Sequence, residues 1–356
     1  MTPERRQALL ATKLRALAAT LPGWDEGAVA RPFPAGASFL HGRTGFLLVE
    51  ESRRERDPQE RSSDRESPRG WLGGAVIWAA RNGATRLQIM LDVVNGSDAR
   101  RSALYRIAPT LWRVDGRSLT PVAPSPAFVE AAPPPIDVLA FAGIIEAAGA
   151  DAVVEHGELR AEVLGLEVGR VRVDEDLGPV LEVGVGRHDR LANEMLHVGT
   201  DSEEVLRRAV EVVSDRRSGR AGPHPANQLQ RERWLRSVLC AYPTLAGFAG
   251  HALRPVAGTE PMQLKRSAPA VALASRRDRS ERTEIVDAVV ACTVTLDLDA
   301  VSYAADARLA WAHDTTLVVC VPEADDSAIL HELAAALVDP AEVRLIADDW
   351  RNDRDK

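Results

Sequence analysis

Arginines gather in one stretch of the sequence, SDRRSGRAGPHPANQLQRERWLR, where they could bind a phosphate group. Arg216, Arg217, Arg220 and His224 fill a predicted loop, and the helix that follows carries three further arginines. Guanidinium groups and helix N-termini both favour phosphate oxygens, so the stretch predicts a site for a phosphate ligand or for nucleic-acid phosphates. The alternative is a solvated surface, because acidic residues interrupt the arginines.

A second group of polar residues follows an apolar strand in the segment LEVGVGRHDRLANEMLH. Glu182 lies on that predicted strand and Glu167 on the strand before it, so the two carboxylates could point to the same face of a sheet. Arg187 and His188 follow where a helix should begin. Asp189 has a simpler interpretation, as a cap or first-turn carboxylate that interacts with the helix dipole. The two glutamates could likewise alternate outward on a half-exposed sheet.

The predicted order of elements over residues 137–200, a helix, three strands and a helix, resembles the core of the PD-(D/E)xK nuclease superfamily. This resemblance implies that Glu167 and Glu182 are metal ligands, which hold Mg²⁺ or Mn²⁺ and so activate water. The sequence departs from the family pattern at one decisive position, because the tripeptide that should read acid, any residue, lysine is EVG here. Arg187 and His188 would have to replace the missing lysine as catalytic residues that act on the phosphate.

Two functions follow from these patterns. One is a divalent-metal-dependent phosphodiesterase or nuclease that uses the two glutamates. The other is a non-catalytic scaffold or binding module with a degenerate nuclease-like fold, in which the same elements only build the structure. The missing lysine favours the second, and the clustered Glu, Arg, His and Asp side chains favour the first. Dinucleotide, mononucleotide, hydrolase and zinc-binding motifs are absent from the sequence.

A third acidic group lies near the C-terminus, in the segment LDLDAVSYAADARL. Asp297 and Asp299 lie at the end of a predicted strand, and Asp306 and Arg308 lie on the next helix. These oxygens could hold a hard cation. The alternative is that Asp299 caps a helix and that Asp306 is neutralised by Arg308.

The composition excludes several kinds of protein. The chain has 356 residues and a net charge of −8, so any binding to nucleic acid must use a local patch. Only three of the 44 basic residues are lysine, which nearly excludes a catalytic lysine and indicates a GC-rich genome such as that of an actinobacterium. Three separated cysteines and the lack of any targeting or membrane segment predict a cytoplasmic protein that does not contact membranes.

Strands alternate with helices along most of the chain, which predicts an α/β fold of the mixed α+β kind. We expect a central restriction-endonuclease-like unit between two smaller α/β units. The first and third units share an order of elements, but the sequence shows no convincing residue-level repeat. The predicted parts are an N-terminal helix and turn-rich lead (1–36), a first unit (37–123) with a disordered insertion (51–70), a proline-rich linker (124–136), the central unit with its C-terminal helices (137–250) and a third unit (268–350).

Overall fold

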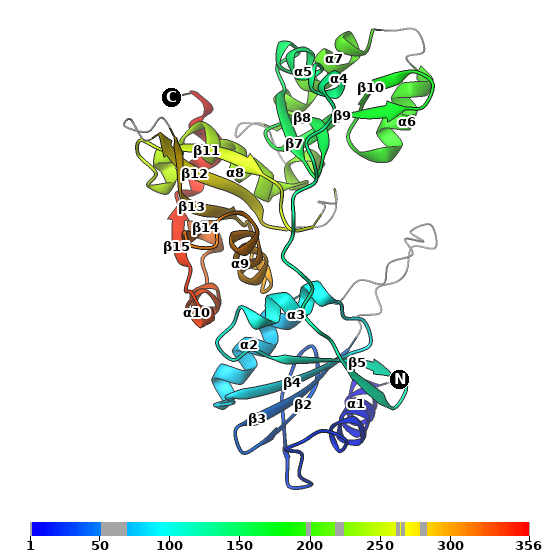
Figure 1. Ribbon diagram of the computed structural model, residues 1–356, viewed down its shortest axis with the longest axis vertical. Coiled ribbons are helices and arrows are strands. Elements are labelled where there is room, and N and C mark those ends of the chain that lie inside the picture. Colours follow the sequence, from blue (N-terminus) through cyan, green and yellow to red (C-terminus); the bar gives the residue numbers. More distant parts are fainter. Residues whose placement is uncertain are drawn as a thin grey trace. The chain divides into compact units, whose positions relative to one another are not determined.

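The computed structural model has a mixed α/β fold with three β-sheets in the described part of the chain, which confirms the predicted fold class (Figure 1). The predicted insertion, apart from Gly70, lies outside the described residues. Residues 124–135 of the predicted linker (124–136) form no helix or strand, and Ile136 begins a helix. The structure describes residues 2–50, 70–196, 201–217, 224–260, 264, 268–277 and 283–355.

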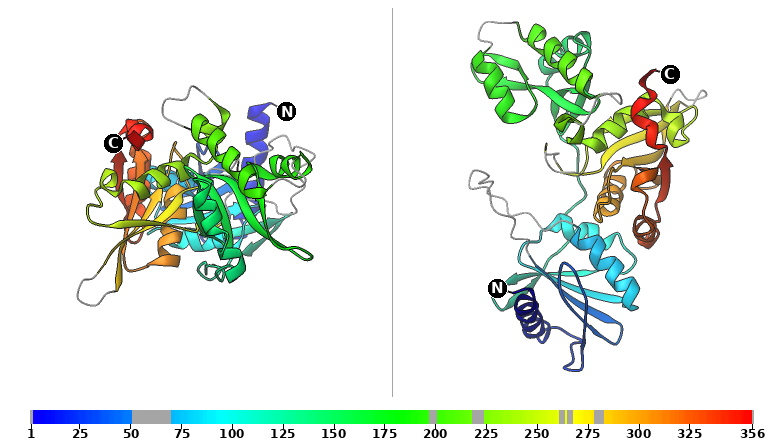
Figure 2. Two further views of the ribbon diagram at one scale, coloured as in Figure 1. Left: turned by 90° about the horizontal axis from the view of Figure 1, so that it is seen from above. Right: turned by 180° about the vertical axis from the view of Figure 1, so that it is seen from behind.

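The first sheet has six strands in the order β1-β2-β3-β4-β5-β6, of which β3, β4 and β5 are parallel. Helix α1 covers one face, and α2 and α3 cover the other (Figure 2). Strand β3 reads TGFLLV and is buried along its whole length, as expected for a strand covered on both faces. The elements are α1 (Pro3–Ala18), β1 (Val29–Arg31), β2 (Gly36–His41), β3 (Thr44–Val49), α2 (Trp71–Asn82), β4 (Arg86–Leu91), α3 (Gly96–Ala103), β5 (Thr110–Asp115) and β6 (Ser118–Pro121).

The structure differs here from the predicted boundary at residue 36. Helix α1 buries Leu14, Leu17 and Ala18 against the sheet, and β1 pairs with β2. The predicted lead is therefore part of the first sheet and its core. An apolar stripe on a helix must be buried against something, and the nearest apolar surface is this sheet. The predicted hairpin at Asp115-Gly116 is confirmed by the pairing of β5 with β6.

The second sheet is an antiparallel meander, β10-β9-β8-β7, and we call it the meander below. It has four strands where the sequence predicts three, because Leu164 and Gly165 both take a positive φ and turn the predicted long strand back on itself. Gly165 is required for a second reason, since a Cβ there would lie 2.4 Å from the backbone of Arg233. The elements are α4 (Ile136–Leu139), α5 (Ala142–Ala147), β7 (Asp151–Glu155), β8 (Glu158–Val163), β9 (Leu166–Asp174), β10 (Gly178–Val183), α6 (Gly186–Leu196) and α7 (Ser202–Arg216).

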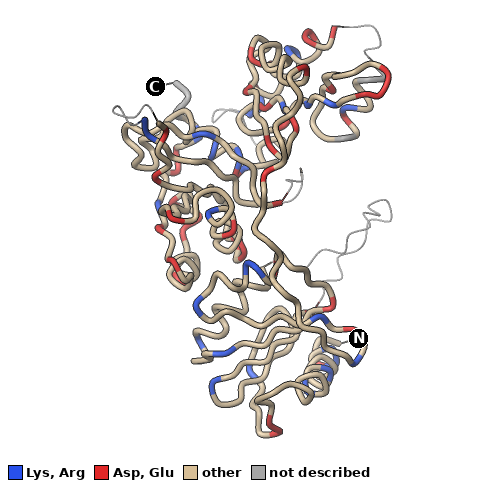
Figure 3. Tube along the Cα trace, viewed as in Figure 1, with Lys and Arg blue, Asp and Glu red and all other residues tan. Residues whose placement is uncertain are grey.

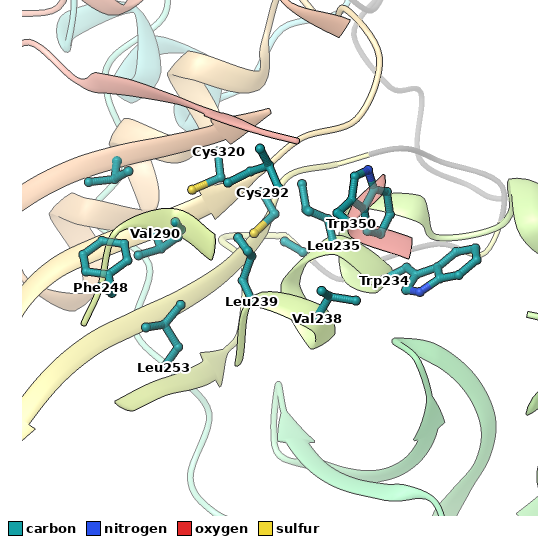
Figure 4. Close-up of a cluster of buried hydrophobic side chains, with 14 of the residues drawn as sticks. Trp234, Leu235, Val238, Leu239, Phe248, Leu253, Val290, Cys292, Cys320 and Trp350 are labelled. Carbon is teal, nitrogen blue, oxygen red and sulfur yellow. The ribbon is translucent and has the colours of Figure 1, made fainter. Parts of the chain in front are cut away.

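The third sheet has the order β11-β12-β13-β14-β15, and β13, β14 and β15 are parallel. Helix α8 buries Trp234, Val238 and Leu239 against it, together with Cys292 and Cys320 of the central strands (Figure 4). The sequence places α8 in the central unit, but its apolar face belongs to this core. The elements are η1 (Pro225–Gln228), α8 (Arg231–Ala241), η2 (Pro243–Ala246), β11 (Ala252–Val256), β12 (Ala270–Arg277), β13 (Glu284–Cys292), α9 (Ala300–Trp311), β14 (Thr316–Pro322), η3 (Glu323–Asp325), α10 (Ala328–Ala336), β15 (Glu342–Ile346) and η4 (Asp348–Asp355).

The first and third sheets share one topology. In each, a helix packs on three antiparallel strands, and two further strands follow in parallel, each after a helix. Helices α2 and α9 have the same length. The N-cap residue Asn95 precedes β5 by as many residues as the N-cap residue Ser327 precedes β15. Gly23-Trp24 and Gly247-Phe248 are a trace of the repeat in the sequence, because both glycines have a positive φ and both aromatic rings pack into the core. The chain therefore contains the same α/β fold twice.

The described residues form two compact units. Unit 1 comprises residues 1–127, 297–306 and 327–341, and unit 2 comprises the rest. Within unit 1, equivalent positions of the two repeats meet. Tyr105 pairs with Leu337 through a reciprocal pair of bonds, from Arg106 N–H to Ala336 O and from Val338 N–H to Leu104 O. Contact between equivalent residues is the pattern of an isologous interface, here formed inside one chain.

Candidate functional site

One face of the meander carries charged residues, and we call it the charged face. Figure 3 shows acidic and basic residues side by side on these strands. A β-bulge between β8 and β9 creates this face, because the pairing moves from Ala161↔Gly169 to Glu162↔Glu167 and skips one residue of β9. Without the bulge, Glu167 and Arg170 would point to opposite faces. The opposite face packs into an apolar core under α5 and α7.

Glu167 and Glu182 do lie on the same face, and Arg190 of α6 lies between them. Arg190 Nη1 is 2.8 Å from Glu167 Oε1, and Arg190 Nε is 3.7 Å from Glu182 Oε2. Glu182 also binds Arg172 at 2.6 Å and Arg170 at 3.4 Å. Burial would raise the pKa of Glu182, but the hydrogen bonds from the two arginines outweigh it and lower the pKa. Guanidinium groups thus neutralise the two carboxylates that the sequence predicts as metal ligands.

No group of three or more His, Cys, Asp and Glu side chains that could hold a metal ion occurs among the described residues. His188 is exposed in the first turn of α6. No hydrogen bond or ion pair among the described residues links it to either glutamate. The side chain of Arg187 lies outside the described residues, so its predicted role stays a prediction. Asp189 accepts a hydrogen bond of 2.9 Å from Val185 N–H, which confirms its interpretation as a carboxylate that caps the start of α6.

The predicted phosphate-binding arginines have different environments. Arg217 is fully buried and donates to the carbonyl oxygens of Leu164, Ala226, Leu229 and Gln230 at 2.7–3.0 Å. It also lies over the ring of Trp234. Burial lowers its pKa to about 9, so it stays cationic at neutral pH. Arg217 holds the chain segment after α7 in place, and it is not available to a phosphate.

Two other residues of the predicted loop, Arg216 and His224, are not buried. Arg216 is exposed at the end of α7, and no described residue forms an ion pair with it. His224 accepts a hydrogen bond through Nδ1 from Ala226 N–H at 3.2 Å and so caps η1. Arg220 lies outside the described residues. Arg216 and His224 are therefore the two described members that a ligand could reach.

Arg216 and His224 line a cavity of about 450 Å³, which we call the α6–α7 groove. Its surface is mostly apolar, and the exposed part includes Val212, whose side chain is 60 % exposed. The only sequence signal for it is the spacing of the apolar residues on α7, which also describes an ordinary core face. The groove is lined by Leu166, Gly184, Val185, Asp189, Asn193, Val205, Arg208, Ala209, Val212, Val213, Arg216, His224, Ala226 and Leu229.

Two arginines of α8, which the sequence assigns to the phosphate cluster, turn inward instead. Arg233 and Arg236 bind Glu155 at 2.7 and 2.6 Å, and both also pair with Glu162. All four side chains are at most 4 % exposed. Burial would raise the pKa of Glu155, but the charges of Arg236 and Arg233 outweigh it and lower the pKa to about 2. This buried network fixes the meander to α8, so that part of the charged face is an internal interface.

The acidic group near the C-terminus is also structural. Asp299 accepts hydrogen bonds from Gly70 N–H at 2.6 Å and Gly73 N–H at 3.2 Å. The predicted cap is thus present, but it serves α2 and not the helix that follows Asp299 in the sequence. Asp306 is fully buried, and both Arg100, at 2.6 and 2.8 Å, and Arg101, at 3.2 Å, bind its carboxylate.

In the described part of the chain, every helix is too short or too polar to cross a membrane. No protein-family model, curated protein or solved structure matches the chain. The function of this chain therefore has to be inferred from the chemistry of its site.

Proposed function

We propose that this protein is a non-catalytic binding module and that its ligand occupies the α6–α7 groove. The observation that carries this proposal is the groove itself, a mostly apolar cavity of about 450 Å³ whose wall includes Arg216, an exposed arginine with no ion-pair partner among the described residues. Small-molecule sites are typically concave and mostly apolar, with a few polar groups that orient the ligand, and their volumes are about 300–1,000 Å³.

The state of the other candidate residues also favours binding over catalysis. Glu167 and Glu182 are held in ion pairs with arginines, which leaves little carboxylate charge for a metal ion. The cysteines are poor nucleophiles, because burial raises the pKa of Cys240 to about 11 and of Cys320 to about 12. Arg217 supports the groove wall through backbone carbonyls and does not contact solvent.

A fluorescent probe that is both apolar and anionic, 8-anilinonaphthalene-1-sulfonate, tests the proposal on the full chain. We expect saturable fluorescence enhancement with the wild type. Ala209→Trp places a large ring in the groove and should abolish the enhancement. Val173→Trp is the matched control, because Val173 is an exposed valine on β9 of the same unit that does not line the groove.

Equal probe binding by the wild type and both variants would place the probe elsewhere and overturn the proposal. So would the absence of saturable binding to the wild type. Circular dichroism of each variant separates loss of the groove from loss of the fold.

A further inference from the structure

We infer that the ligand of the α6–α7 groove is a linear fatty acid, whose hydrocarbon chain lies along α7 and whose carboxylate binds Arg216 and His224. This inference rests on the proposed function and names the class of ligand. It follows from three features of the groove, namely its shape, the position of its free positive charge and the shortage of polar partners along its walls.

The apolar surface of the groove follows helix α7. Val205, Ala209 and Val212 recur at helical spacing along α7, and the stripe ends at Arg216. Residues 205 to 216 advance about 16 Å along the helix axis at 1.5 Å per residue. The lining of the cavity of about 450 Å³ therefore extends along about three turns of α7, which suits an extended hydrocarbon chain.

The free positive charge lies at one end of this stripe. Arg216 has no ion-pair partner among the described residues, whereas Arg208, on the same helix, binds Glu204 at 3.0 Å. His224 uses Nδ1 as an acceptor for Ala226 N–H, so in the neutral ring Nε2 carries the hydrogen and can donate it. Arg216 and His224 both line the groove, and together they offer donors for the two oxygens of one carboxylate.

The remaining polar groups of the groove argue against a peptide. Asn193 donates one of its two Nδ2 hydrogens to Val183 O at 3.0 Å, and Asp189 accepts from Val185 N–H at 2.9 Å. Among the described lining residues, the polar side chains of Asp189, Asn193 and Arg208 thus already have a partner. Few described groups remain to pair with the N–H and C=O groups of an extended backbone, which are costly to bury unpaired. A bound helix is about 10 Å wide and would not fit into a cavity of this volume. A hydrocarbon chain needs no such partners, and the carboxylate of Asp189 disfavours a second negative charge on the ligand.

Calorimetric titration of the full chain with dodecanoate, below its micelle-forming concentration, tests the inference. We expect saturable one-to-one binding that weakens from dodecanoate to hexanoate, because each methylene removed exposes less apolar surface. Methyl dodecanoate, which has no charge, should bind about tenfold more weakly or worse. Arg216→Gln should weaken dodecanoate binding by a similar factor. Arg207→Gln is the matched control, because Arg207 is exposed on the same helix and does not line the groove.

Different failures point to different errors. If dodecanoate does not bind but the fluorescent sulfonate binds and depends on Ala209, the ligand class is wrong and the binding function stands. If neither binds, both are wrong. Equal loss in Arg216→Gln and Arg207→Gln would overturn the assigned carboxylate site. Cosedimentation with phosphatidylglycerol vesicles, in the absence of binding to free dodecanoate, would identify a membrane lipid and overturn the inference of a free fatty acid.

Discussion

The carboxylate of Asp299 should make the stability of unit 1 depend on pH, and Asp299→Asn isolates this dependence. Asp299 lies at the N-terminus of α2 and accepts hydrogen bonds from Gly70 N–H and Gly73 N–H. Gly73 has to be glycine here, because a Cβ would lie 1.9 Å from the carbonyl oxygen of Leu298. The close approach that this glycine allows is what buries the carboxylate.

Burial raises the pKa of Asp299, and repulsion by Asp297 adds to the rise. The N–H groups of Gly73 and Gly70 and the charge of Arg101 lower it, and the resulting pKa is about 6, against 3.8 for an ordinary aspartate. Because the pKa is higher in the folded state, the folded protein binds this proton more tightly than the unfolded chain does. The protonated carboxyl group of Asp299 therefore stabilises the folded state fully below about pH 4, and this stabilisation is lost as the pH rises through 6. A difference of about two pH units corresponds to about 3 kcal/mol.

The assay is urea denaturation of the wild type and Asp299→Asn at several pH values between 4 and 7. Asparagine stays neutral, and its amide oxygen can still cap a helix. The free energy of unfolding of the variant, minus that of the wild type, should therefore increase by about 2 to 3 kcal/mol from pH 4 to pH 7. Asp115→Asn is the control for the loss of one exposed carboxylate in the same unit. A difference that stays constant across this range would refute the reasoning.

Two further predictions concern ion pairs. Asp306→Ala removes a buried carboxylate that binds both Arg100 and Arg101, and it should lower the free energy of unfolding by about 3–5 kcal/mol in urea denaturation. Asp92→Ala, which removes an exposed pair with Lys13, should cost about 1 kcal/mol or less. Similar losses in the two variants would contradict the role given to burial. Millimolar Mn²⁺ should leave the melting temperature of the wild type unchanged. Arg190→Gln removes the arginine that lies between Glu167 and Glu182, so its melting temperature should rise with Mn²⁺. A rise in the wild type that Glu182→Gln removes would instead support the metal-dependent phosphodiesterase.

Local sequence patterns predicted much of the secondary structure. Alternating apolar residues identified most strands, the Asp115-Gly116 turn identified a hairpin, and the proline-rich stretch identified a segment without helix or strand. The two errors in the predicted strands of the meander each have a structural cause. Leu164-Gly165 is a tight turn without the usual Asn-Gly or Asp-Gly signature, so the strand break went unrecognised. The bulge on β9 depends on the pairing of two strands, and no single strand reveals it.

For the site residues, too, some properties follow from the sequence and others only from the tertiary structure. The sequence by itself determined which residues carry charge, and that Glu167 and Glu182 could share a face. Only the tertiary structure decided which arginines neutralise these two carboxylates, because an arginine can pair with any carboxylate that folding brings near it. For that reason Arg217 is buried and donates to four carbonyl groups, while its neighbour Arg216 is exposed at the groove. Asp299 likewise caps a helix that starts more than two hundred residues earlier. Periodicity along a chain shows which face of an element is buried, but what covers that face depends on distant residues that folding brings together.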